Sequence, residues 1–137
     1  MPRIHALAAA SQKRIKFMNI RVITFDLDNT LWDVEPAILR AEQAQRSWLL
    51  QHRPGCIEQY DHDALWEFKK RVWKQYPELA HHVSQMRIRM LFELQKAAGF
   101  STQDSEAGAR EAFAAFLRER HKVELYAEAL DVLQQLS

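Results

Sequence analysis

Apolar residues along this chain follow two different spacings, and each spacing predicts a different backbone structure. The segment from Ile20 to Phe25 is rich in β-branched and aromatic residues and stops at Asp26, which is typical of a β-strand. Beyond Asp33, apolar residues recur every three or four positions, which is the spacing of one face of a helix. We therefore expect a single strand followed by helices.

Residues that begin or end helices divide the second part of the chain into five predicted helices. The first starts near Val34 and ends at the turn Arg53-Pro54-Gly55. The later boundaries are set by an Asp61 or Asp63 cap, a stop at Pro77, a stop at Gly99 and a Ser101 or Thr102 cap. The fifth helix includes Ala129 and Leu136.

Composition narrows the class of protein. The chain has 137 residues, 47% of them hydrophobic, which is enough for one domain with a core and excludes disorder. No apolar run approaches the roughly 20 residues of a membrane span. Cys56 is the only cysteine, so the chain has no internal disulfide, and we expect a cytoplasmic location. The net charge of +1 does not favour nucleic acid, and residues 1–19 are interpreted as a basic tail.

Two carboxylates directly after the predicted strand form the chemical motif of the sequence. Asp26 and Asp28 stand where open α/β sheets bind ligands, and the turn-forming residues that follow would bring both to one site. One carboxylate can act as a nucleophile while the other exchanges protons with the leaving group, and such oxygen ligands suit Mg²⁺. The alternative is a polar turn or a helix cap without catalytic function.

The segment Val-Ile-Thr-Phe-Asp-Leu-Asp-Asn-Thr-Leu at residues 22–31 resembles the first motif of the haloacid dehalogenase superfamily. The resemblance implies that Asp26 is the nucleophile and forms an aspartyl-phosphate. It implies that Asp28 is the general acid/base, that both acids take part in the Mg²⁺ site, and that Thr30 holds the turn and orients Asp28. True haloacid dehalogenases lack the second acid, so the resemblance implies a phosphatase that acts on a small phosphorylated metabolite.

The resemblance also predicts the domain organisation. Many members insert a four-helix cap after the first motif, and residues 34–122 have the length for it. Residues 20–33 would then be the first strand and catalytic loop of an α/β Rossmann-like core, and residues 123–137 the return to that core. This part of the protein is expected to be mainly α, with one strand and a four-helix cap bundle. The segment with Arg87 and Arg89 resembles part of the cap of bacterial phosphatases, which implies that Arg87 or Arg89 faces the substrate. The alternative is that both lie on a solvated helix face.

The later motifs of the superfamily are not recognisable in this sequence. A second strand ending in Ser or Thr, a phosphate-binding Lys and a further acidic pair are all missing, so we expect the 137-residue chain alone to be inactive. The alternative function is a non-catalytic helical interaction module. An unpaired strand or uncovered apolar faces would favour a homodimer.

A pair of tryptophans offers one further alternative. Trp66 and Trp73 lie seven residues apart among basic residues, which would suit a nucleic-acid surface, but Glu67 and the overall charge oppose it. We therefore expect no nucleic-acid partner and no membrane partner, and interpret the two tryptophans as helix packing.

Overall fold

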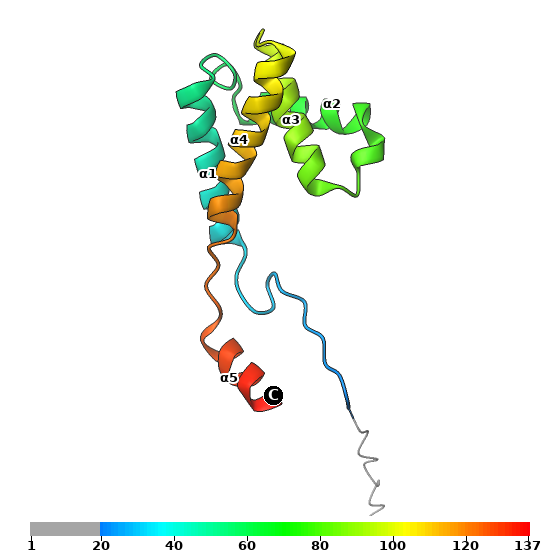
Figure 1. The fold of residues 1–137 in the computed structure, drawn as a ribbon, viewed down its shortest axis with the longest axis vertical. Helices are drawn as coiled ribbons and strands as arrows, with labels where there is room; N and C mark the ends of the chain where they lie inside the picture. The colour runs from blue at the N-terminus through cyan, green and yellow to red at the C-terminus, as the bar shows by residue number, and fades with distance from the viewer. Residues whose placement is uncertain (1–19) are drawn as a thin grey trace, which may run out of the picture.

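A computed structural model describes residues 20–137 as a chain of helices (Figure 1). The elements are α1 (Glu35–His52), α2 (His62–Gln75), the short 3₁₀ helix η1 (Pro77–Leu79), α3 (Val83–Ala97), α4 (Thr102–Arg120) and α5 (Ala127–Leu136). The predicted mainly helical class is confirmed. The basic tail interpreted at residues 1–19 lies outside the described residues.

Helices α1 to α4 form one packed unit. Helix α4 runs back alongside α1 and also packs against α3, while α2 contacts α3 on the outside of the unit (Figure 1). Helix α5 lies apart from this unit, at the end of an extended segment that follows α4. The packed unit accounts for most of the buried residues of the protein.

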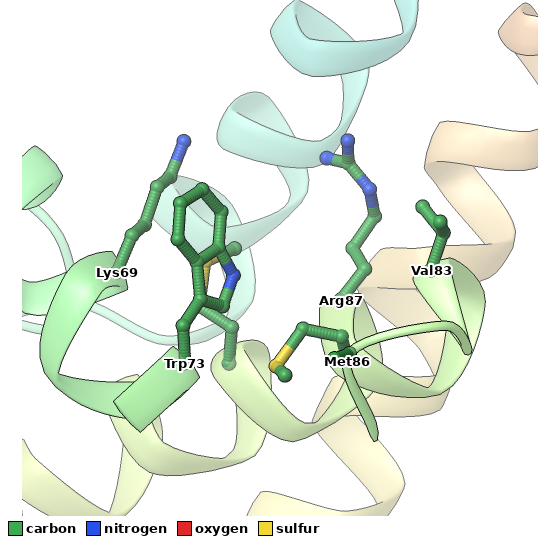
Figure 2. Close-up of a pocket in the computed structure, with 7 residues that line it drawn as sticks. Lys69, Trp73, Val83, Met86 and Arg87 are labelled. Atoms are coloured by element: carbon green, nitrogen blue, oxygen red, sulfur yellow. The ribbon is translucent and has the colours of Figure 1, made fainter. Parts of the chain in front are cut away.

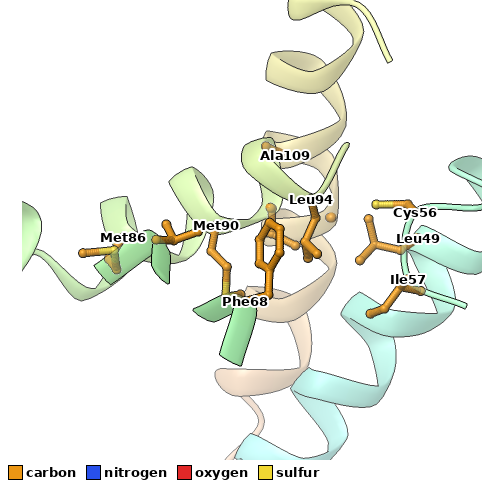
Figure 3. Packing of buried hydrophobic residues seen from close by; sticks show 11 residues of the cluster. Leu49, Cys56, Ile57, Phe68, Met86, Met90, Leu94 and Ala109 are labelled. Carbon is orange, nitrogen blue, oxygen red and sulfur yellow. The ribbon is translucent and has the colours of Figure 1, made fainter. Parts of the chain in front are cut away.

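The hydrophobic core lies where α1, α2, α3 and α4 meet (Figure 3). Leu49, Leu91 and Leu94 are almost completely buried there, together with the thiol of Cys56. Burying each large aliphatic side chain contributes about 1.5–3 kcal/mol, so these residues supply much of the stability of the unit. The remaining members of the cluster are Ile57, Phe68, Val72, Met86, Met90, Ala109 and Ala112.

The helix boundaries follow the capping residues that the sequence indicated. The carboxylate of Asp61 accepts a hydrogen bond from the Ala64 amide at 2.8 Å, and the Ser101 hydroxyl accepts one from the Asp104 amide at 3.0 Å. Helix α3 ends before Gly99, whose φ of +92° is a conformation that glycine adopts without strain. Of the alternative caps, the structure therefore selects Asp61 and Ser101.

A buried polar contact joins α1, α3 and α4. The Gln95 side chain is fully buried, and its Oε1 accepts a hydrogen bond from Arg53 Nε at 2.9 Å. Gln95 Nε2 donates to the Leu91 carbonyl at 3.1 Å, so both ends of the amide are satisfied. Gly108 of α4 faces this pair, and a Cβ atom there would overlap Gln95 Oε1 and lie 2.8 Å from Arg53 Nε. A side chain at position 108 would therefore displace the Gln95 amide or the Arg53 guanidinium.

The predicted strand is not formed among the described residues. The segment from Ile20 to Leu27 is exposed and carries no strand assignment, with Ile20 at 68% and Val22 at 78% exposure. A β-strand needs a hydrogen-bonded neighbour, and none of the described residues supplies one to this segment. The apolar pattern therefore identified a segment suited to a sheet, while strand formation also depends on a partner.

Trp66 and Trp73 are 46% and 43% exposed, and their rings meet edge to face with centroids 5.3 Å apart. The two rings therefore pack on each other and stay partly open to solvent, rather than being buried in the core. None of the helices described for residues 20–137 is long and apolar enough to cross a membrane.

Candidate active site

The acidic motif forms a tight loop between the extended segment and α1. The Thr30 and Leu31 amides both donate to the Leu27 carbonyl, at 3.2 and 2.9 Å, and the Asn29 amide donates to the Trp32 carbonyl at 2.7 Å. Asn29 has a φ of +60°, in the left-handed region that asparagine tolerates better than most residues. The chain therefore reverses directly after Asp28.

Asp28 is held at this turn by two donors. Arg120, the last residue of α4, donates from Nη2 to both oxygens of the Asp28 carboxylate, at 2.7 and 3.0 Å. The indole Nε1 of Trp32 donates to Asp28 Oδ1 at 3.0 Å. The Asp28 side chain remains 47% exposed, so its carboxylate is oriented by these contacts and still reaches solvent. Charge-assisted hydrogen bonds of this kind are stronger than neutral ones.

Asp26 and Thr30 have fewer contacts. Asp26 is exposed at the end of the extended segment, and no side-chain hydrogen bond to it occurs among residues 20–137. Thr30 is also exposed and lines a cavity of about 300 Å³ together with Phe25, Leu31 and residues of α5. Its hydroxyl has no hydrogen-bond partner in the described part of the chain, where the orientation of Asp28 comes from Arg120 and Trp32 instead.

The acidic loop is also tied to the segment that leads into α5. The Tyr126 amide donates to the Leu31 carbonyl at 2.9 Å, and Trp32 forms an isolated antiparallel bridge with Leu125. Arg40 of α1 donates to the Lys122 carbonyl at 2.6 Å. The acidic loop before α1 and the segment between α4 and α5 therefore lie side by side.

The donors of this loop fit Mg²⁺ in part. Carboxylate and carbonyl oxygens are the ligands that Mg²⁺ prefers, and Mg²⁺ is commonly bound through one or two carboxylates with several waters retained. Among residues 20–137 no cation pairs with the exposed carboxylate of Asp26, whereas the Asp28 carboxylate already contacts Arg120. Within residues 20–137 there is no cluster of three or more His, Cys, Asp or Glu side chains that could hold a metal ion. These donors are therefore suitable in kind and make up only part of a site.

Arg87 and Arg89 both lie on α3 and line different cavities. The Arg87 guanidinium lies over the Phe116 ring at 3.9 Å from its centroid, and burial lowers the pKa of Arg87, with Glu42 opposing the shift. Arg89 lies over Tyr76 and forms an ion pair with Glu93 at 3.7 Å. No hydrogen bond or ion pair joins either arginine to Asp26 or Asp28 in the described chain.

Comparisons with known proteins show which family the chain belongs to. The family model of the haloacid dehalogenase-like hydrolases matches residues 20–137, which include the acidic loop and the helices α1 to α5. The chain belongs to the haloacid dehalogenase-like hydrolases. This family assignment confirms the resemblance that the motif at residues 22–31 indicated.

Two relatives place the chain within the family. It is 30% identical over 118 residues to the 5-amino-6-(5-phospho-D-ribitylamino)uracil phosphatase YigB of Escherichia coli (strain K12), covering 86% of this chain and 49% of that protein. It is 37% identical to the 2-haloacid dehalogenase of Pseudomonas syringae pv. Tomato DC3000, with a TM-score of 0.73 over 81% of this chain and 48% of that structure. The chain thus spans about half the length of the relatives it matches.

The two residues that hold Asp28, Trp32 and Arg120, were not identified as site residues from the sequence, and Arg120 is the more distant one. Arg120 stands 92 positions after Asp28, and nothing near it in the sequence resembles the first motif. The only signal was its place among the basic residues of the last turn of a helix, which is common for reasons of helix polarity alone. The contact depends on the tertiary packing that brings the end of α4 beside the loop.

Proposed function

We propose that this chain is part of a Mg²⁺-dependent phosphatase that acts on a small phosphorylated metabolite. Membership of the hydrolase family and the similarity to a phosphatase support the reaction class. The observation that carries the proposal is the second acid of the motif, Asp28, which is exposed and held in place by Arg120 and Trp32. A phosphatase needs such a proton donor because its leaving group is an oxygen that must be protonated.

The proposed reaction has two steps. A carboxylate oxygen of Asp26 attacks phosphorus, so that an acyl-phosphate bond forms on Asp26 and the bond to the leaving oxygen breaks. Asp28 gives its proton to the leaving oxygen and then removes one from the water that attacks the phosphorus. The products are the free alcohol, inorganic phosphate and an unchanged Asp26. Thr30 is proposed to support the turn, and Arg87 and Arg89 remain candidates for contact with substrate.

Asp26 and Asp28 are the residues of this chain that would hold Mg²⁺. When bound, the ion would neutralise part of the phosphate charge and so lower the cost of bringing an anionic nucleophile to an anionic substrate.

We assign residues 34–122 to a cap and residues 20–33 and 123–137 to the catalytic core. Most of the large apolar side chains that are exposed lie in the proposed core segments, among them Ile20, Val22, Leu130 and Leu136. Such a concentration of exposed apolar surface is typical of faces that contact other protein. The same faces are the basis for proposing a homodimer, and the protein is proposed to work in the cytoplasm.

The test is to sequence the gene beyond the Ser137 codon and to assay the 137-residue chain and any longer product against a panel of phosphorylated metabolites. We expect Mg²⁺-dependent phosphate release by the longer product and none by the shorter chain. Asp26→Asn should lower kcat at least about a thousandfold. The matched control is Asp33→Asn, in the same loop, because asparagine retains the contact between residue 33 and the Glu35 amide.

The outcomes separate the two candidate functions. Phosphatase activity that survives Asp26→Asn would contradict the proposed nucleophile, and Asp26-dependent turnover by the short chain would contradict its proposed inactivity. A reading frame that stops at Ser137, with no turnover, would favour the helical interaction module instead.

A further inference from the structure

A cavity between α2 and α3 has neither Asp26 nor Asp28 in its wall, although it includes Arg87, one of the two candidates for contact with substrate. Its volume is about 440 Å³, within the usual range for a site that binds a small molecule. Lys69 and Trp73 line it from α2, and Met86, Arg87 and Met90 line it from α3 (Figure 2). The wall is mostly apolar, and the side chains of Lys69 and Arg87 bring two positive charges to it.

The two cations of this cavity have no acidic partner in the part of the chain that the structure describes. The neighbouring Lys70 pairs with Glu67 at 2.6 Å, and Arg89 pairs with Glu93, whereas Lys69 and Arg87 make no ion pair and no side-chain hydrogen bond there. Arg87 is half-buried, and Glu42 acts on it only from beyond ion-pair distance. A half-buried guanidinium with unused donors favours an anion, because its charge has lost part of its hydration.

The apolar wall between the two cations suits a planar group. Figure 2 shows Lys69 and Arg87 extending toward the same side, with the Trp73 ring between them. Trp73 is 43% exposed and presents a ring surface that a second ring can stack on. Met86 and Met90 are buried side chains of the same cavity wall, and methionine adapts its shape to aromatic partners.

We propose that this cavity binds an organic anion that carries a planar apolar ring. Arg87 and Lys69 contact the anionic group, and Trp73 and the two methionines contact the ring. The inference follows from the cavity, its unpaired cations and its ring surface, and it does not depend on the phosphatase chemistry of Asp26 and Asp28.

Naphthalene-2-sulfonate is a suitable probe because it has both features and cannot be hydrolysed by a phosphatase. Binding to the 137-residue chain would be measured by calorimetry, with the indole N–H signal of Trp73 followed by NMR. We expect saturable binding, a shift of the Trp73 signal and an unmoved Trp32 signal. The uncharged 2-naphthalenemethanol should bind about tenfold more weakly or worse, because it cannot form charge-assisted hydrogen bonds.

Variants identify the residues responsible. Arg87→Gln and, independently, Lys69→Gln should each weaken sulfonate binding severalfold to tenfold while leaving the weaker binding of the alcohol unchanged. Because Arg87 also packs on Phe116, Arg87→Gln could disturb the fold. The Lys69→Gln variant tests the site without changing that contact. Arg89→Gln is the matched control on the same helix and should leave binding unchanged, as should Asp26→Asn.

Three results would overturn the proposal. The first is no saturable binding at millimolar sulfonate, and the second is equal affinity for the sulfonate and the alcohol. The third is an equal loss of affinity in Arg87→Gln and Arg89→Gln, which would indicate a general effect of net charge. Asp26→Asn should still bind the sulfonate even where it abolishes phosphatase activity. A failure of the binding proposal can therefore be distinguished from a failure of the proposed phosphatase function.

Discussion

At the scale of single residues, Gly108 has an effect opposite to that of most helical glycines. Glycine inside a helix usually costs about 0.5–1 kcal/mol relative to alanine because it loses more backbone freedom on folding. Here the missing Cβ makes room for the hydrogen bond between Arg53 and the buried amide of Gln95. Because Gln95 is held at both ends, it cannot move aside without losing a hydrogen bond.

We therefore expect Gly108→Ala to lower the free energy of unfolding by about 1–2 kcal/mol, since the lost bond to a charged group outweighs the gain in helix propensity. Urea denaturation followed by circular dichroism would measure it. When Gln95 is already replaced by alanine, Gly108→Ala should lower the free energy of unfolding much less than it does in the original chain. The difference between the two effects is the coupling free energy of the two positions. A Gly108→Ala variant as stable as the original chain would contradict this account.

At the scale of elements, the contact between Arg120 and Asp28 fastens the end of α4 to the acidic loop. The pair is partly exposed, and such pairs contribute about 0–1 kcal/mol to global stability. Its main effect is therefore local: the ion pair holds the loop between Asp28 and Trp32 in one conformation.

Arg120→Gln should accelerate amide hydrogen exchange at residues 29–32 and change the free energy of unfolding by less than about 1 kcal/mol. Mass spectrometry of exchanged peptides would follow the loop and the helices separately. Arg118→Gln is the control, because Arg118 is an exposed residue of the same helix turn and carries the same charge. Equal exchange in both variants would show that the ion pair does not order the loop.

The elements also differ in how far the sequence could predict them. The helices were predictable because their apolar spacing, their caps at Asp61 and Ser101 and their stop at Gly99 are local features. The strand at residues 20–25 was not, because its formation depends on a neighbour elsewhere. The same difference holds at the site, where Asp26 and Asp28 follow from a local motif and the contact with Arg120 depends on the packing of α4.

At the scale of the whole molecule, the protein divides into a helical unit with its own core and a lower part around the acidic loop and α5 (Figure 1). Only the α1–α4 unit buries a cluster of large aliphatic side chains among the described residues. Cooperative unfolding should therefore be that of the helical unit, whereas the extended segment and α5 have little buried surface to lose.

The buried Cys56 makes this unfolding directly observable. Its thiol is 0% exposed, and burial raises its pKa to about 11 from an ordinary value of 9.0. Because the folded-state pKa is the higher one, the thiol stabilises the fold fully below pH 9, and this contribution declines as the pH rises toward 11. At pH 8 the folded protein therefore holds Cys56 as a neutral, inaccessible thiol that does not react with iodoacetamide.

Because Cys56 is the only cysteine in the sequence, the rate of its alkylation measures how often the helical unit opens. The rate, followed by intact mass, should be low in the native protein and rise with urea. Gly108→Ala should accelerate it about tenfold for each 1.4 kcal/mol of lost stability, and Arg120→Gln should leave it unchanged. Rapid alkylation without denaturant would mean that the core around Leu49 and Cys56 is open. A chain this size thus carries one internal reporter, placed where opening must expose it.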